Sequence, residues 1–232
     1  ILVNPNIFFM RNIRSRNNTV VHECVHWDRH DKFFELQKLL NSDLSSLSWV
    51  VIENKSQKDS GIDGALQWME WQANALTPRI LLPASTTRQK LKDILLCLHI
   101  ENPERSESDI MEEAIQELSD FFAVSKFAAK LRAIELGFTQ AQGVWNYVNG
   151  KYLPSFSFKA TALKKDESYI IDTRNACYEA NFDESAKAAL SNGDFLYVDS
   201  MYCINDPKYV SETEDGGCTL TAYARQHVDE CC

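Results

Sequence analysis

Apolar residues recur at helical spacing along most of the chain before Gly137, and short polar stretches separate the resulting segments. The pattern predicts a helix that begins at residues 17–19 and runs through about His30 or beyond. Further helices are predicted at 65–82, 85–100, 109–122 and 126–136. Pro78 lies inside the second of these segments, and it is expected to kink or divide that helix.

The segments between and after these helices favour extended structure and loops. Residues 1–10 mix Ile, Val and Phe with Asn and Pro, which is typical of short extended pieces near a sheet edge. Residues 41–64 predict a long loop with one short strand at 49–52. Beyond Gly150 the pattern predicts short strands at 169–172 and 195–198 among polar turns.

Composition and charge disfavour several classes of protein. The 232 residues carry a formal net charge of -9, which disfavours nonspecific attraction to nucleic acid. No apolar run approaches the roughly 18 residues that a membrane span needs, and no secretory signal opens the chain. The chain opens with Ile1, which suggests a fragment or a processed product that could have lost a targeting segment. Seven cysteines without regular spacing favour reduced thiols and therefore a cytoplasmic protein.

One motif in the sequence has residue types that can bind a metal ion and activate water. His22-Glu23-Cys24-Val25-His26 has the pattern HExxH, and on a helix its two imidazoles project from one face about one turn apart. Zinc accepts neutral imidazole nitrogens, and a catalytic zinc site uses three protein ligands and one open position for water. Glu23 is placed to take a proton from that water as a general base. The third ligand must come from elsewhere in the chain, and by residue type alone Glu35, Glu53, Asp63 and Glu70 compete for that role.

A second motif follows at residues 70–83, which read Glu-x-x-Ala-Asn and then end in Leu-Leu-Pro. The two motifs together resemble ImmA/IrrE-type metallo-endopeptidases, and the resemblance continues through a Phe-x-Val-Ser helix pair to cover about 17–138. It implies that Glu70 is the third zinc ligand and that a protein, for example a bacterial transcriptional repressor, is cut at a limited site. Ala75-Leu76-Thr77-Pro78 departs from the family's usual Phe-Ala pair, and the loop between the motifs is longer than usual.

The fold class expected from these observations is α+β, with a zincin-like metallopeptidase core in which a small sheet packs on the HExxH helix and on a second ligand helix. The core is expected at 1–105, a helix-turn-helix-like extension at 106–150, and a C-terminal α+β region of unknown role at 151–232. The expected protein is a cytoplasmic zinc endopeptidase with metal ligands His22, His26 and Glu70 and the catalytic base Glu23. Its oligomeric state is not predicted.

Several other residues are candidates for supporting roles. His30 is either a partner of a metal ligand or a surface residue, and Asp28 or Asn74 could orient a ligand. The oxyanion of the transition state needs a donor besides zinc, for which the candidates are Tyr147, Arg79 and His99. Trp27, Trp68 and Trp71 either line a cleft for an apolar substrate side chain or pack the two ligand helices together.

Two other groups of residues could form a site or have ordinary structural roles. The helix pair at 109–136 could read DNA with Lys126, Lys130 and Arg132, but its first helix is acidic, so a packing role is favoured. Cysteines 203, 218, 231 and 232 with His227 could bind a second zinc ion, but their spacing lacks a CxxC pair, so ordinary thiols are favoured. The rival functions are a non-proteolytic regulatory protein and a DNA-binding protein that keeps the metallopeptidase fold.

Overall fold

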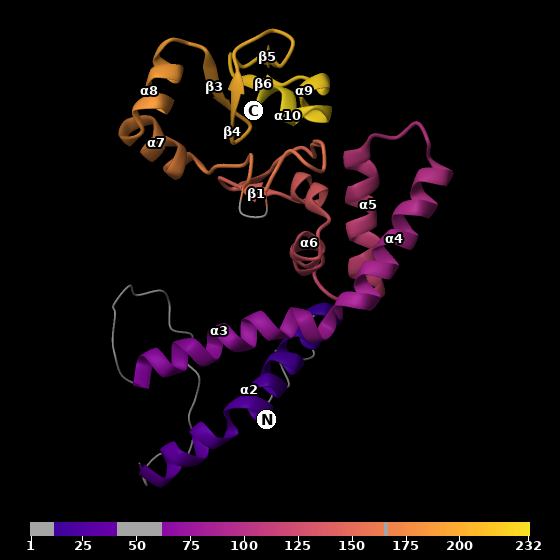
Figure 1. Ribbon diagram of the computed structural model, residues 1–232, viewed down its shortest axis with the longest axis vertical. Coiled ribbons are helices and arrows are strands. Elements are labelled where there is room, and N and C mark those ends of the chain that lie inside the picture. The colour runs from indigo at the N-terminus through magenta and orange to yellow at the C-terminus, as the bar shows by residue number, and fades with distance from the viewer. Residues whose placement is uncertain (1–11, 41–61, 165–166) are drawn as a thin grey trace. The chain divides into compact units, whose positions relative to one another are not determined.

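The computed structural model describes residues 12–40, 62–164 and 167–232, which form two compact units (Figure 1). The described part of the first unit comprises 12–40, 62–83 and Phe122–Ser125, and the second comprises Ala84–Phe121 and the chain from Lys126 onward. The extended pieces predicted at 1–10, the strand at 49–52 and Glu53 lie outside the described residues. The three-region division with boundaries near 105 and 150 stays a prediction.

Two long helices, α2 (Ile13–Leu40) and α3 (Ile62–Leu81), pack against one another in the first unit (Figure 1). The α2 helix begins earlier than predicted because Asn12 caps it, its side-chain oxygen accepting the Ser15 N–H at 2.9 Å. The α3 helix continues through Pro78 as one helix, so Pro78 does not divide it, and the alternative of a kink stays a prediction. Ala73 is fully buried, and its small side chain allows the two backbones to approach.

Three shorter helices open the second unit: α4 (Ala84–Glu101), α5 (Glu107–Phe121) and α6 (Lys126–Glu135). All three confirm the predicted helices, with small differences at the ends. The apolar positions at helical spacing are buried, and they include Leu91, Ile94 and Leu98 of α4 and Ile110, Ile115 and Leu118 of α5. Gly137, at a φ of 98°, ends the α6 turn as expected.

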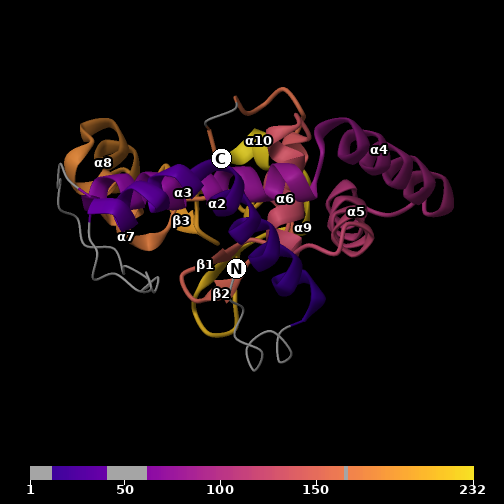
Figure 2. The same ribbon diagram turned by 90° about the horizontal axis from the view of Figure 1, so that it is seen from below.

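The remainder of the second unit combines three two-stranded antiparallel sheets with short helices. The sheets pair β1 (Tyr147–Val148) with β2 (Lys151–Tyr152), β3 (Phe195–Val198) with β4 (Met201–Ile204), and β5 (Val210–Glu212) with β6 (Cys218–Leu220). The helices are a 3₁₀ turn (Thr139–Gly143), α7 (Thr173–Phe182), α8 (Glu184–Ser191), α9 (Ala222–Gln226) and α10 (Val228–Cys231) (Figure 2).

The strand predicted at 195–198 is confirmed as β3, and the one predicted at 169–172 is wrong. Ile171 donates one backbone hydrogen bond to Ser200 O at 2.9 Å, but the chain then turns into α7, which Asp172 caps. An aspartate that accepts the N–H of the third helical residue starts a helix and ends an extended segment.

The α+β class is confirmed, and the described residues are mostly helical. Every strand among them lies at or after Tyr147, in the second unit. The small sheet expected beside the HExxH helix stays a prediction. Within the described ranges, no helix has the length and apolar character needed to cross a bilayer.

Candidate metal centre

Three side chains from the two helices of the first unit converge on one point. His22 Nε2 and His26 Nε2 lie 3.1 Å apart, one turn from each other on α2. The carboxylate of Glu70 on α3 reaches both, with Oε2 at 3.2 Å from His22 Nε2 and Oε1 at 3.2 Å from His26 Nε2. The structure thus brings together the three residues that the sequence proposes as metal ligands.

The spacing of these atoms suits a single divalent cation. Nitrogen and oxygen ligands at about 2.0–2.1 Å from tetrahedral zinc lie about 3.3 Å from one another. The two imidazole nitrogens are 3.1 Å apart and each lies 3.2 Å from a different oxygen of the Glu70 carboxylate, and these separations are close to that value. Two imidazoles and one carboxylate also form the His₂Glu donor set of hydrolytic zinc sites, so the residues fit the metal in both geometry and chemistry.

A second pair of residues fixes the tautomer of His26. Gln72 Oε1 accepts from His30 Nε2 at 3.0 Å, which leaves His30 Nδ1 as the acceptor for the Nδ1–H of His26, also at 3.0 Å. In this arrangement the Nε2 of His26 directs its lone pair toward the Glu70 carboxylate. Two acceptors that face each other at 3.2 Å repel unless a cation or a proton lies between them.

His30 is therefore not a surface residue, and it is bonded to His26, one of the candidate ligands. Its side chain is buried at the α2–α3 contact, and it joins α2 to Gln72 of α3. A histidine ligand whose second nitrogen is held in this way keeps its ring orientation.

Burial also favours the neutral form of His26. The pKa of His26 is lowered, and desolvation by burial is the largest cause. The charges of His22 and His30 lower the pKa further. The carboxylates of Glu70 and Glu23 act in the opposite direction. A lowered pKa favours the neutral imidazole, which is the form that binds metal ions.

Glu23 follows His22 on α2 and is half-buried. Its charge is felt at His26, so the carboxylate lies in the electrostatic neighbourhood of the three converging groups. Glu35, a competing third ligand, is exposed further along the same helix and does not join the group. The side chain of Asp63 lies outside the described residues.

Four of the five other candidates for supporting roles have local contacts, and Asn74 is an exposed residue. Asp28 is exposed and pairs with Arg29 at 3.0 Å, and Asn74 is exposed on α3. Arg79 donates to Ala75 O of its own helix at 3.1 Å. His99 and Tyr147 belong to the second unit, where His99 bonds Leu95 O at 2.7 Å and the Tyr147 ring packs on Tyr152. None of these contacts involves the converging groups, and the donor to an oxyanion stays unassigned.

The three tryptophans beside the ligands do not pack the two helices together. Trp27, Trp68 and Trp71 are 70%, 57% and 58% exposed. The rings of Trp68 and Trp71 stack at 4.7 Å between centroids, with an angle of 12° between their planes. Such exposure disfavours the packing role, and the lining of a cleft for an apolar substrate side chain stays a prediction.

The basic residues of α6 are held within the second unit. Lys130 and Arg132 are buried, Lys130 donating to Asn146 Oδ1 and Arg132 pairing with Glu135 at 2.7 Å. Lys126 Nζ lies 3.6 Å from the centroid of the Trp145 ring. Buried cations cannot neutralise a phosphate backbone, so these positions support a packing role for the helix pair.

The burial of Lys130 gives a pH-dependent prediction. Desolvation lowers its pKa to about 8, whereas an unfolded lysine titrates near 10.4. As pH rises from 8 to about 10.4, the unfolded chain loses the proton that the folded chain has already lost. The buried Lys130 therefore destabilises the fold progressively less as pH rises.

Lys130→Met removes this titrating group. The difference in free energy of unfolding between Lys130→Met and the wild type should therefore become less favourable to the variant by roughly 2–3 kcal/mol across that pH window. Urea unfolding at pH 8 and pH 10 measures this change, and the exposed Lys92→Met is the control. Equal changes in the two variants would contradict the assignment.

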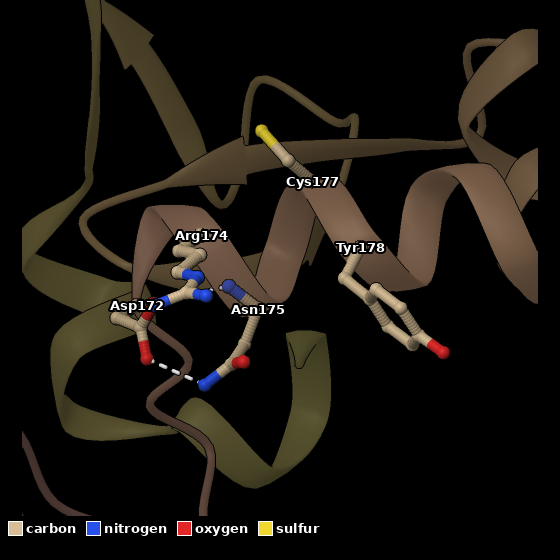
Figure 3. A pocket seen from close by; sticks show the side chains of 5 residues that line it. All are labelled: Asp172, Arg174, Asn175, Cys177 and Tyr178. Atoms are coloured by element: carbon tan, nitrogen blue, oxygen red, sulfur yellow. Dashed lines mark hydrogen bonds between the residues drawn. The ribbon is translucent and has the colours of Figure 1, made fainter. Parts of the chain in front are cut away.

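The described surface also has a pocket at the start of α7, lined by Asp172, Arg174, Asn175, Cys177 and Tyr178 (Figure 3). The Asp172 carboxylate is occupied in capping the helix, accepting the Asn175 backbone N–H at 3.0 Å and its side-chain amide at 2.6 Å. The backbone bond from Asn175 is the main cause that lowers the pKa of Asp172. Cys177 and Tyr178 point away from this pair, so the pocket assembles no catalytic group (Figure 3).

Comparisons of the chain with protein-family models, curated proteins and solved structures find no match. The interpretation of the metal centre therefore depends on its own residues and geometry.

Proposed function

We propose that the protein is a zinc-dependent endopeptidase, with His22, His26 and Glu70 as the metal ligands and Glu23 as the general base. The observation that carries this proposal is the convergence of two imidazole nitrogens and one carboxylate within 3.1–3.2 Å of each other. The His30–Gln72 pair supports it, because it orients the Nε2 of His26 toward the other two ligands.

When bound, zinc supplies a Lewis acid that polarises a peptide carbonyl and lowers the pKa of a coordinated water. The residues of the chain provide the rest of the chemistry. Glu23 accepts the proton of the attacking water and returns it to the leaving amine, which requires a carboxylate close to the ligands but not bound as one of them. Its position one residue after His22 and its half-buried side chain meet that requirement.

The substrate class follows from the sequence resemblance and from the surface. The resemblance to ImmA/IrrE-type peptidases supports a zincin-like core and a protein substrate, with a transcriptional repressor as the proposed kind. The exposed Trp27, Trp68 and Trp71 offer an aromatic surface for apolar side chains of that substrate. All seven cysteines are free, which suits the reducing cytoplasm that we propose as the compartment.

The test uses a pool of random-sequence peptides as the substrate, with mass spectrometry as the readout. Zinc-loaded protein should cleave peptide bonds in this pool, a chelator should abolish cleavage, and added zinc should restore it. Zinc binding without cleavage would favour the rival, a regulatory protein that keeps the metal. Cleavage that persists after complete removal of metal would contradict the proposal.

A further inference from the structure

A second group of metal-binding side chains lies in the core of the second unit. Cys203 on β4, Cys231 at the end of α10 and the adjacent Cys232 place their sulfur atoms within 4.8 Å of one another. The sulfurs of Cys231 and Cys232 are 3.7 Å apart. The group is distinct from the His22–His26–Glu70 centre, and it does not depend on the proposed peptidase activity.

Local structure brings these thiols together from two elements. Burial alternates along β4, so Met201 and Cys203 share its buried face. Val228 and Cys231, three residues apart, face the same core from α10, and the helix ends there so that Cys232 can turn toward the same point. Cys203 and Cys231 are 0% and 1% exposed, whereas Cys232 is half-buried and gives access from solvent.

The other cysteines of the chain behave differently. Cys24, Cys97, Cys177 and Cys218 are all exposed and none of them joins a cluster of possible ligands among the described residues. Cys218 and His227, which the sequence grouped with the three clustered cysteines, are not members of the group. The expectation of ordinary thiols thus suits Cys218, while the three core thiols share an arrangement that needs its own explanation.

The spacing of Cys231 and Cys232 matches that of two thiolates on one metal ion. Sulfur ligands at about 2.3 Å from a tetrahedral ion lie about 3.8 Å apart, and the Cys231–Cys232 separation is 3.7 Å. Soft thiolate ligands select thiophilic ions such as Zn²⁺ and Cu⁺. Three thiolates complete a trigonal Cu⁺ site, and they leave one position for a further ligand on Zn²⁺.

Metal binding by this group has a defined proton balance. A bound cation would replace the thiol protons, so each thiol would release one as its sulfur–metal bond forms.

We propose that Cys203, Cys231 and Cys232 bind one thiophilic metal ion of the Zn²⁺ or Cu⁺ class. The ion joins the β3–β4 hairpin to α10 and stabilises the core formed by Phe156, Phe158, Val198 and Leu220.

Cobalt titration of the reduced, full-length protein under anaerobic conditions tests the site. Thiolate ligation of Co²⁺ produces a near-ultraviolet charge-transfer band, to which a His₂Glu site contributes nothing. We expect the band to reach its full intensity by two equivalents, because the His22–His26–Glu70 centre also takes up cobalt, both in the wild type and in Cys218→Ser, which removes an exposed thiol from the same region. Cys203→Ser and Cys232→Ser should each weaken binding by about 100-fold or more, since each removes a ligand.

Circular dichroism establishes that each variant is folded, and if the buried Cys203→Ser unfolds, the half-buried Cys232→Ser decides the question. Absence of the band in the wild type, or an unchanged affinity in folded Cys232→Ser, would overturn the proposal. Competition experiments identify the preferred ion. Zn²⁺ and Cu⁺, the latter supplied as its acetonitrile complex, are each added to the cobalt-loaded protein. The preferred ion is the one that removes the cobalt band at the lower free concentration. Failure of both ions to remove it would also overturn the proposal.

Discussion

Glu23→Gln is expected to retain zinc at wild-type affinity and to cleave peptides at least about 100-fold more slowly. The amide keeps the size and polarity of the side chain but cannot accept the proton of the attacking water. His22, His26 and Glu70 are unchanged, so the metal should remain. Steady-state cleavage of the peptide pool and metal content measured on the same preparation separate the two effects.

Glu35→Gln is the matched control for this variant, because it removes an exposed carboxylate from the same helix outside the group of converging atoms. It should cleave like the wild type. Undiminished cleavage by Glu23→Gln would remove the assigned base, and equal losses in both variants would indicate a general effect of charge on α2.

Glu70→Ala should lower zinc affinity by about 100-fold or more, with a parallel loss of activity at limiting zinc. The carboxylate lies 3.2 Å from both imidazoles, so its removal leaves only two ligands on one face of α2. Competition with a chromophoric chelator measures the affinity. A correctly folded variant with full zinc affinity would show that the third ligand lies elsewhere.

Asn74→Ala, one turn further along α3, controls for changes in helix stability. Asn74 is exposed and does not belong to the cluster, so this substitution should leave zinc affinity unchanged. A comparable loss in Asn74→Ala would instead assign Asn74 a part in holding the ligands.

The relation of the two histidines in the candidate metal centre could be predicted because it is local. Two histidines four residues apart on a helix must share a face, so the relation of His22 to His26 follows from helix geometry alone. The approach of Glu70 is a contact between two helices, and it was implied by a family resemblance and not by spacing. The role of His30 depends on Gln72 of the facing helix, which the sequence did not connect to it.

The helices between 84 and 136 were predictable for a similar reason, since their buried residues repeat at helical spacing. In contrast, α7 and α8 carry no buried apolar stripe, with Ala176 their one fully buried residue. The sequence feature that marks the starts of α7 and α8 is the pair of capping aspartates, Asp172 and Asp183. The β1–β2 hairpin also had a local signal, because Asn149 and Gly150 adopt φ angles of 52° and 81°, as a two-residue Asn-Gly turn requires.

Features that depend on distant parts of the chain could not be predicted in this way. The Cys203–Cys231–Cys232 group joins a strand to a helix end 28 residues away, and no CxxC spacing marks it. The sequence favoured a packing role for the helix pair because its first helix is acidic, but lysine is rarely buried and nothing in the pattern connected Lys130 to Asn146. In both cases the contact that decides the outcome lies outside the segment that supplies the pattern.

Anomalous diffraction from zinc-soaked crystals, measured on both sides of the zinc absorption edge, tests the central claim most directly. The proposed function predicts a zinc peak about 2.0–2.2 Å from His22 Nε2, His26 Nε2 and a Glu70 carboxylate oxygen. A peak at the cysteine group would be separate and would not bear on this claim. A fully zinc-loaded protein whose anomalous map is empty at His22, His26 and Glu70 would contradict the account.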